Sequence, residues 1–157
     1  MTDLSARSQR VADQLRAAGV TSNIVTLPDS AATAALAAAA LGTEVGAIAN
    51  SLVFVADDQP LLVMTSGAHR VDTALLAERL GKQRIVRARP EQVVAATGQV
   101  IGGVAPVGHP SHIETVIDET LAQFDELWAA DGTAHTVFPL TFDELVAVTG
   151  GSVLAVS

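Results

Sequence analysis

The sequence predicts an α+β fold, in which residues 1–157 form a single compact domain with helices around a central mixed, largely antiparallel sheet. Strand pairs joined by hairpin turns alternate with single helices, and this order favours such a sheet over a doubly wound parallel one. A length of 157 residues fits one ordinary domain. Hydrophobic residues make up 49% of the chain and charged residues 17%, which is the composition of a globular protein.

The first third of the chain is expected to hold two helices around a short strand. Apolar spacing predicts a helix over residues 5–18 that ends at Gly19, followed by a strand over 24–27. The Pro-Asp-Ser sequence at 28–30 supplies a turn and an N-cap for an alanine-rich helix over 31–41. Because that helix has almost no polar face, we expect it to pack against the sheet.

A hairpin opens the central part of the chain. Two apolar runs, 48–56 and 61–65, flank the turn sequence Asp-Asp-Gln-Pro at 57–60. The same criteria predict a helix over 71–80, a strand over 85–87, a helix over 90–97, strands over 115–117, 126–129 and 135–139, a helix over 141–148 and a strand over 153–156.

The sequence lacks the residues and motifs that several common catalytic and metal sites require. The chain has no cysteine, which excludes a thiol nucleophile and a thiolate zinc site. It also lacks a G-x-S-x-G elbow and a P-loop. His109 and His112 are three residues apart, but Pro110 breaks the helix that would align them and no carboxylate has ligand spacing. We therefore expect no metal and no cofactor.

Charge is distributed unevenly along the chain. The formal net charge is -8, which argues against a protein that grips nucleic acid over its whole surface, and we expect no DNA partner. Residues 70–89 nevertheless carry a net charge of +4, whereas residues 90–157 hold no Lys or Arg. This basic stretch suits contact with one phosphate-bearing end, or it is a solvated face. No apolar run is long enough to span a membrane, and no secretory signal is visible, so a cytoplasmic location is expected.

Two loops have residues suited to ligand binding. The run 98–110 contains Gly102, Gly103 and Gly108, where the backbone can approach a ligand and offer N–H groups to a developing oxyanion. The run 65–70 contains Gly67, His69 and Arg70, which could meet a phosphate or a ribose. Taken alone, the first run is more simply read as an ordinary connecting loop, and the second could be a helix N-terminus with solvated charges.

An ordered set of segments resembles the YbaK family, the editing domains related to the insertion domain of bacterial prolyl-tRNA synthetase. The segments are ANSLVF (49–54), SGAHRVD (66–72), GGVAPVG (102–108), DGTAHTVF (131–138) and DELVAVTG (143–150). The resemblance implies a YbaK-like fold and the deacylation of mischarged tRNA. The implied partners are the 3′ end of a tRNA that carries an amino acid and, as a further candidate, an aminoacyl-tRNA synthetase.

The resemblance also implies where the substrate binds. The expected pocket is formed by Asn50 and Ser51 on one strand, by the loop from Gly102 to Pro106, and by the region of His135. Within it, Asn50, Gly102 and Gly103 are the candidate catalytic positions. The candidate substrate-binding residues are Ser51, Gly67, His69, Arg70, Val104, Ala105, Pro106, Gly108 and His135.

Asn50 departs from the family pattern, which usually has a lysine at this position. Asparagine keeps the capacity for hydrogen bonds but loses the positive charge. With Asn50 at this position, the chain either belongs to a subfamily with a different substrate or binds its ligand without hydrolysing it. The competing function is a non-catalytic module that binds an aminoacyl-adenosine-like ligand or a partner protein.

Overall fold

The computed structural model describes residues 3–20, 24–28, 33–99, 103–133 and 135–157, and it gives the side chains from residue 9 onward. The helices are α1 (Asp3–Ala17), α2 (Ala34–Leu41), α3 (Thr73–Leu80), α4 (Pro90–Thr97) and α5 (Phe142–Thr149), with 3-10 turns η1 (Val45–Ala47) and η2 (Glu119–Gln123). The strands are β1 (Val25–Thr26), β2 (Ile48–Ala56), β3 (Gln59–Ser66), β4 (Ile85–Arg87), β5 (Glu114–Asp118), β6 (Leu127–Ala130), β7 (Thr136–Leu140) and β8 (Ser152–Leu154).

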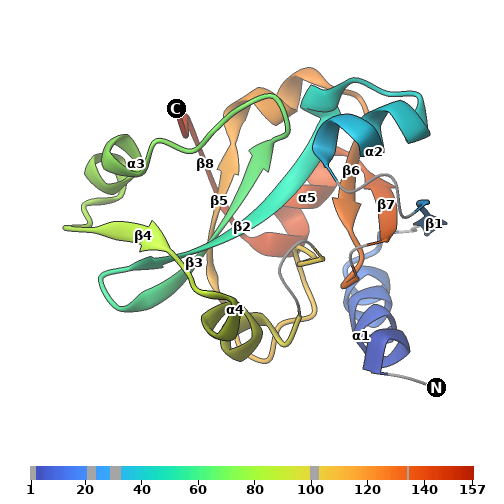
Figure 1. The fold of residues 1–157 in the computed structure, drawn as a ribbon, viewed down its shortest axis with the longest axis horizontal. Coiled ribbons are helices and arrows are strands. Elements are labelled where there is room, and N and C mark those ends of the chain that lie inside the picture. Colours follow the sequence, from blue (N-terminus) through green and yellow to red (C-terminus); the bar gives the residue numbers. More distant parts are fainter. Residues whose placement is uncertain (1–2, 21–23, 29–32, 100–102, 134) are drawn as a thin grey trace.

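The eight strands found among the described residues all belong to one mixed sheet, which confirms the predicted fold class (Figure 1). The strand order is β1-β7-β6-β2-β3-β5-β8, and β4 pairs with β2 outside this path. The pairs β1–β7, β2–β3, β2–β4 and β6–β7 are antiparallel, whereas β2–β6, β3–β5 and β5–β8 are parallel. The parallel pairs place the long β2–β3 hairpin in the middle of the sheet.

Helices cover both faces of the sheet because the side chains of β2 alternate between them. On one face Ala49 and Val53 join a core that includes Leu15 of α1, Val93 of α4 and Leu145 of α5. On the other face the neighbouring strand positions contact α2 and α3 in two smaller cores, which contain Ile48 with Ala37 and Phe54 with Leu76. The sheet is therefore the middle of three layers.

Local sequence explains the ends of these elements. Asp57 and Asp58 take positive φ angles of 48° and 69° in the two-residue hairpin turn, a conformation that Asp tolerates better than most residues. The hydroxyl of Thr141 accepts a hydrogen bond from the Glu144 N–H, and the Glu144 carboxylate accepts one from the Thr141 N–H. These two bonds form a capping box at the N-terminus of α5. Gly150 ends that helix in the left-handed region.

The alanine-rich helix packs on the sheet as expected, but its start differs from the prediction. The structure gives Thr33 as the N-cap of α2, because its hydroxyl accepts a hydrogen bond from the Leu36 N–H at 3.2 Å. The expected cap at Ser30 lies outside the described residues. Serine and threonine are both favoured N-caps, with serine ranked higher, so sequence alone pointed to the earlier position. No described helix is long and apolar enough to cross a membrane.

Candidate functional site

The pairing of β2 is interrupted at the centre of one of its edges. Parallel pairing with β6 covers Ile48 and Ala49, and antiparallel pairing with β4 covers Phe54–Ala56. Between these two segments no described strand pairs with this edge of β2. The sheet therefore has an opening beside Asn50–Val53, between two strands that diverge from each other.

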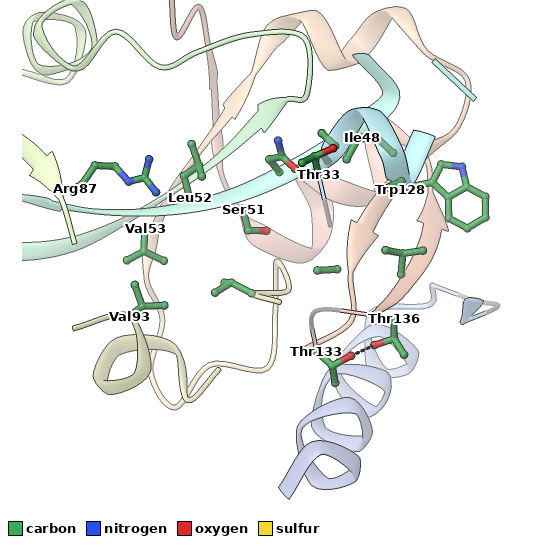
Figure 2. Close-up of a pocket in the computed structure, with 17 residues that line it drawn as sticks. Thr33, Ile48, Ser51, Leu52, Val53, Arg87, Val93, Trp128, Thr133 and Thr136 are labelled. Carbon is green, nitrogen blue, oxygen red and sulfur yellow. Dashed lines mark hydrogen bonds between the residues drawn. The ribbon is translucent and has the colours of Figure 1, made fainter. Parts of the chain in front are cut away.

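A cavity of about 460 Å³ lies at this opening. Figure 2 shows Ser51, Val53 and Val93 on one side of β2, and Leu52 and Arg87 on the other, so the cavity extends around the strand edge. The other described residues that line it are Thr33, Ala34, Ala37, Ile48, Ala49, Asn50, Val104, Trp128, Ala130, Thr133, Thr136 and Val137. The lining is mainly small and apolar, with a few side-chain hydroxyl and amide groups.

Asn50 and Ser51 bring polar groups into this cavity. Both are half-buried on β2, opposite Thr65 and Met64 of β3. The amide of Asn50 forms no hydrogen bond with a described residue, and the hydroxyl of Ser51 donates only to the Met64 thioether at 3.2 Å, a weak acceptor. Both side chains are thus able to bind a ligand.

The opposite wall is formed by β6, β7 and the turn between them. Thr133 and Thr136 share a hydrogen bond of 2.5 Å between their hydroxyl oxygens (Figure 2). Both line the cavity, whereas His135 between them is exposed and does not line it. The cavity wall near the expected His135 region therefore consists of two threonines.

Part of the glycine-rich loop forms the floor of the cavity. Gly102 lies outside the described residues. Gly103 is buried next to Val104, and only Val104 lines the cavity. Ala105 is also buried, and its N–H donates to the side-chain oxygen of Gln99 at 2.7 Å.

The end of this loop packs away from the cavity. Pro106 lines a separate hollow of about 250 Å³ that also contains His109 and His112. Gly108 has a φ of +89°, and an added Cβ there would approach Val11 of α1 to 2.9 Å. Its N–H donates to the side chain of Gln14 at 2.9 Å, so this glycine joins the loop to α1.

Burial lowers the pKa of His109, although a hydrogen bond between its Nε2 and the Ala105 carbonyl opposes the shift. A neutral imidazole in this position suits a structural contact with the loop. No group of three or more His, Cys, Asp or Glu side chains in the described part of the chain could hold a metal ion.

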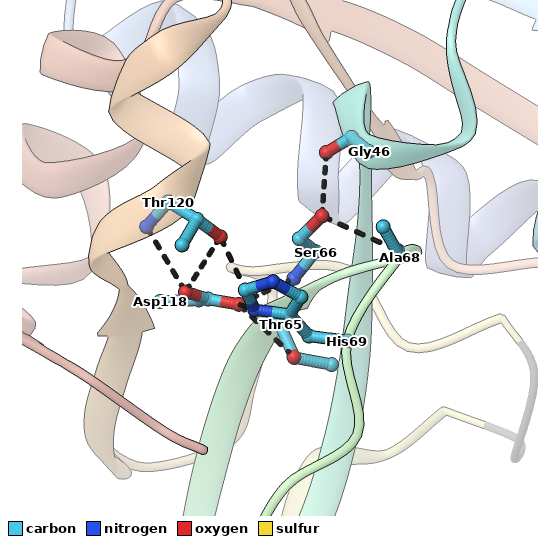
Figure 3. A network of polar contacts seen from close by, with 7 residues as sticks. All are labelled: Gly46, Thr65, Ser66, Ala68, His69, Asp118 and Thr120. Carbon is cyan, nitrogen blue, oxygen red and sulfur yellow. Dashed lines mark hydrogen bonds and ion pairs between the residues drawn. The ribbon is translucent and has the colours of Figure 1, made fainter.

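The loop after β3 builds a polar network with the end of β5 and the two 3-10 turns (Figure 3). Asp118 at the end of β5 lies 3.2 Å from His69 Nδ1 and accepts hydrogen bonds from the Ser66 N–H and the Thr120 hydroxyl. The hydroxyl of Ser66 donates to the Gly46 carbonyl at 2.8 Å. The network joins β3, β5 and the two 3-10 turns.

Asp118 is ionised in this setting. Burial alone would raise its pKa, but the N–H groups of Thr120 and Ser66, the Thr120 hydroxyl and the charge of His69 together hold that pKa below its usual value. An Asp–His pair of this kind could orient an imidazole for proton transfer. His69 is 34% exposed and does not line the cavity.

Gly67 and Arg70 are also outside the cavity. An added Cβ at Gly67 would meet the Val45 carbonyl at 2.5 Å and Ala34 at 3.0 Å, so close packing of η1 and α2 requires glycine here. Arg70 is exposed in the loop before α3. The cavity therefore brings together Asn50, Ser51 and Val104, and the 65–70 loop lies near its rim at Ala34.

Sequence reasoning missed several residues of the site. Arg87 was seen only as part of a basic stretch, although it is the one charged residue among the described residues of the lining. Val93, Trp128, Thr133 and Thr136 gave no local signal, because each looks like an ordinary helix or strand residue. Gln99 could have been found from the sequence. A glutamine that lies between a helix C-cap glycine and an apolar run is a candidate for a buried side chain that bonds to the backbone.

The chain is similar to several known proteins. A model of the aminoacyl-tRNA editing domain matches residues 28–148. A solved structure described as "Crystal structure of a putative trans-editing enzyme for prolyl tRNA synthetase" is 40% identical, with a TM-score of 0.89 and 98% of each chain covered. "Uncharacterized protein YwhH" of Bacillus subtilis (strain 168) is 33% identical over 118 residues, 74% of each chain.

A third relative has an activity in its name. "Putative Cys-tRNA(Pro)/Cys-tRNA(Cys) deacylase EbsC" of Enterococcus faecalis (strain ATCC 700802 / V583) is 25% identical over 115 residues, 73% of this chain and 70% of that protein. The matched family segment includes β2, α4, the glycine-rich loop and β7, which are the elements around the cavity. The chain therefore belongs to the aminoacyl-tRNA editing domain family and has its YbaK-like fold.

Proposed function

We propose that this chain is a trans-acting aminoacyl-tRNA deacylase that hydrolyses the ester of a mischarged tRNA, a proofreading step in translation. The observation that carries the proposal is the cavity at the open edge of β2. There the hydroxyl of Ser51 lies on the face of β2 that packs toward Val104 of the glycine-rich loop, and the amide of Asn50 lines the same cavity from the opposite face, in a chain of the editing family.

The reaction demands little of the protein beyond orientation and charge stabilisation. An aminoacyl ester is already activated, so binding it in one orientation and donating hydrogen bonds to the oxyanion supplies several kcal/mol. We assign the oxyanion donors to the backbone N–H groups of Gly102 and Gly103. Asn50 positions the aminoacylated terminal adenosine, and Ser51 is the hydroxyl closest to it along the strand.

The attacking nucleophile is a water molecule or a group of the substrate. Among its described residues, the cavity lining contains no His, Asp, Glu or Lys that could act as a general base. That composition suits an activated ester and is unsuited to peptide hydrolysis.

The cavity walls supply the selectivity for the amino acid. Val53, Val93 and Val104 are buried and apolar, so they sort side chains by size, where one methylene is worth roughly 1–3 kcal/mol. The basic stretch of residues 70–89 contacts phosphates of the tRNA. An aminoacyl-tRNA synthetase is a second candidate partner, because one similar structure is described in relation to prolyl tRNA synthetase.

The test is incubation of the purified chain with a panel of mischarged tRNAs and their correctly charged counterparts, followed by measurement of the remaining ester. The proposal expects loss of at least one mischarged species while the correctly charged tRNA survives. Binding of the charged 3′ end without any ester loss would instead favour the non-catalytic module.

A further inference from the structure

The backbone of β2 reveals which of its groups face the cavity. The Ile48 carbonyl accepts the Gly67 N–H at 2.8 Å on the β3 side of the strand. The Val53 carbonyl accepts the Ala88 N–H at 3.1 Å on the opposite side, directly after the end of β4. These two contacts fix the alternation of N–H and C=O groups along the whole strand.

By this alternation, the backbone groups of Asn50 and Leu52 point toward β3, and those of Ser51 and Val53 point toward the cavity. The Ser51 N–H, the Ser51 carbonyl and the Val53 N–H form no hydrogen bond with a described residue. Backbone groups in folded proteins are almost always paired with protein or with water, so three open groups in a row on a cavity wall are available to a ligand.

The order of these groups determines the chemistry they recognise. The Ser51 carbonyl is an acceptor, and the Val53 N–H, two residues further along the same edge, is a donor. Adenine has the complementary pair, because its N6 amino group donates and the adjacent ring nitrogen N1 accepts. RNA-binding proteins commonly read unstacked bases through this Watson–Crick edge.

We propose that the open edge of β2 binds the adenine of the tRNA's terminal adenosine, with the Ser51 carbonyl accepting from N6 and the Val53 N–H donating to N1. This inference rests on the proposed function, which places that nucleotide in the cavity. It assigns base recognition to the backbone of two residues, so side-chain substitutions that leave the cavity open should keep the preference for adenine.

The charges around the edge favour the base over the amino group of the amino acid. Among its described residues the cavity lining contains no carboxylate to balance an ammonium ion, and its charged member is Arg87. Arg87 lies opposite Phe54 in the β2–β4 pairing, one residue from Val53. A neutral base on the edge leaves the guanidinium free to meet the 5′-phosphate of the same nucleotide.

The test uses adenosine 5′-monophosphate (AMP) and inosine 5′-monophosphate (IMP) in separate NMR titrations of the isotope-labelled chain. IMP keeps the size, ribose and phosphate of AMP, but its C6 carbonyl accepts and its N1–H donates. AMP should slow hydrogen exchange of the Val53 amide and shift its proton signal. The amide of Leu52, which faces β3, serves as a control within the same strand, and its hydrogen exchange should not slow.

IMP should bind at least about tenfold more weakly than AMP, since a reversed donor–acceptor pair loses both hydrogen bonds. In a semisynthetic chain, replacing Val53 by α-hydroxyisovaleric acid removes only its N–H, and AMP affinity should fall toward that of IMP. Equal affinities for AMP and IMP, no AMP binding, or an unchanged Val53 amide at saturation would each overturn the inference. Deacylation of mischarged tRNA measured beside any of these results would leave the proposed function intact.

Discussion

The side-chain oxygen of Gln99 accepts a hydrogen bond from the backbone N–H of Ala105 at 2.7 Å. The amide nitrogen of the same side chain donates to the Val107 carbonyl at 3.1 Å. Gln99 is 1% exposed, so one buried amide satisfies two backbone groups of the loop that carries Val104 into the cavity. The position of the cavity floor thus depends on a residue outside the cavity.

Replacing Gln99 by Leu should therefore lower both stability and deacylation. The substitution leaves the Ala105 N–H and the Val107 carbonyl buried without partners, which costs about 1–3 kcal/mol for each group. Thermal unfolding and single-turnover ester loss measure the two effects. Gln123→Leu, at an exposed site in η2, is the matched control. A Gln99→Leu protein with the stability and turnover of the wild type would show that the loop holds its shape unaided.

Asn50 should contribute to transition-state binding. Asn50→Ala should lower kcat/KM by an amount equivalent to roughly 1–3 kcal/mol, because a polar partner on the substrate is left unpaired. Its melting temperature should barely change, since the Asn50 amide bonds to no described residue. A large loss of stability with normal kinetics per folded molecule would make Asn50 a structural residue instead.

Asn50→Lys distinguishes a specialised enzyme from a degenerate one. Lysine restores the charge that the family usually has at this position but cannot accept a hydrogen bond. We expect the substitution to reduce the native activity, measured as kcat/KM on the preferred mischarged tRNA. Increased activity toward that substrate would contradict specialisation.

Asp118 should make the stability of the fold depend on acid pH. Its pKa is lower in the folded protein than the ordinary 3.8, so the ionised form stabilises the fold. That contribution is complete above the ordinary carboxyl pKa and declines as the pH falls toward the folded value. Asp118→Asn should therefore cost roughly 1.5–3 kcal/mol at neutral pH, the worth of hydrogen bonds to a charged group.

The difference in unfolding free energy between wild type and Asp118→Asn should stay constant from pH 7 to about 5 and shrink below about pH 4. Chemical denaturation at a series of pH values measures it. Asp125→Asn, which alters an exposed carboxylate, controls for the change in net charge. A difference that grows on acidification would refute the assigned direction.

The basic stretch should contribute to tRNA binding mainly through Arg87. Arg87→Gln should raise KM far more than it lowers kcat, because phosphate contacts lie away from the reacting ester. It should also flatten the dependence of log affinity on log salt concentration. Arg79→Gln, which removes a charge from α3 outside the cavity lining, is the control. Identical kinetics for the two variants would make the stretch a solvated face.

Much of the fold was predictable because its signals are local. The Asp-Asp-Gln-Pro sequence between two apolar runs predicted the β2–β3 hairpin, and three of the predicted helices end directly before a left-handed glycine, at Gly42, Gly81 and Gly98. Strand order was not predictable. The parallel pairing of β2 with β6 joins residues about eighty positions apart. The amino-acid sequence of neither strand indicates which other strand it pairs with.

The candidate site was predictable only in part, for the same reason. Asn50, Ser51 and Val104 came from segments that resemble the family, and the structure places them on one cavity. His69 looked equally functional in sequence, but its neighbour in space is Asp118, the last residue of a different strand, β5. The opening beside Asn50–Val53 exists because β6 and β4 each stop short, which is a property of the whole sheet.

The central claim is that deacylation takes place in the cavity at the open edge of β2. The most direct measurement compares ester loss from a mischarged tRNA by wild type, Ser51→Leu and Ser152→Leu. Ser51 points into the cavity, so leucine fills reaction space without displacing the core, whereas Ser152 is exposed on β8 (Figure 2). We expect wild type and Ser152→Leu to hydrolyse the ester, and Ser51→Leu to be inactive with a nearly unchanged melting temperature. Full activity of Ser51→Leu, or no activity of the wild type on any mischarged tRNA, would contradict the account.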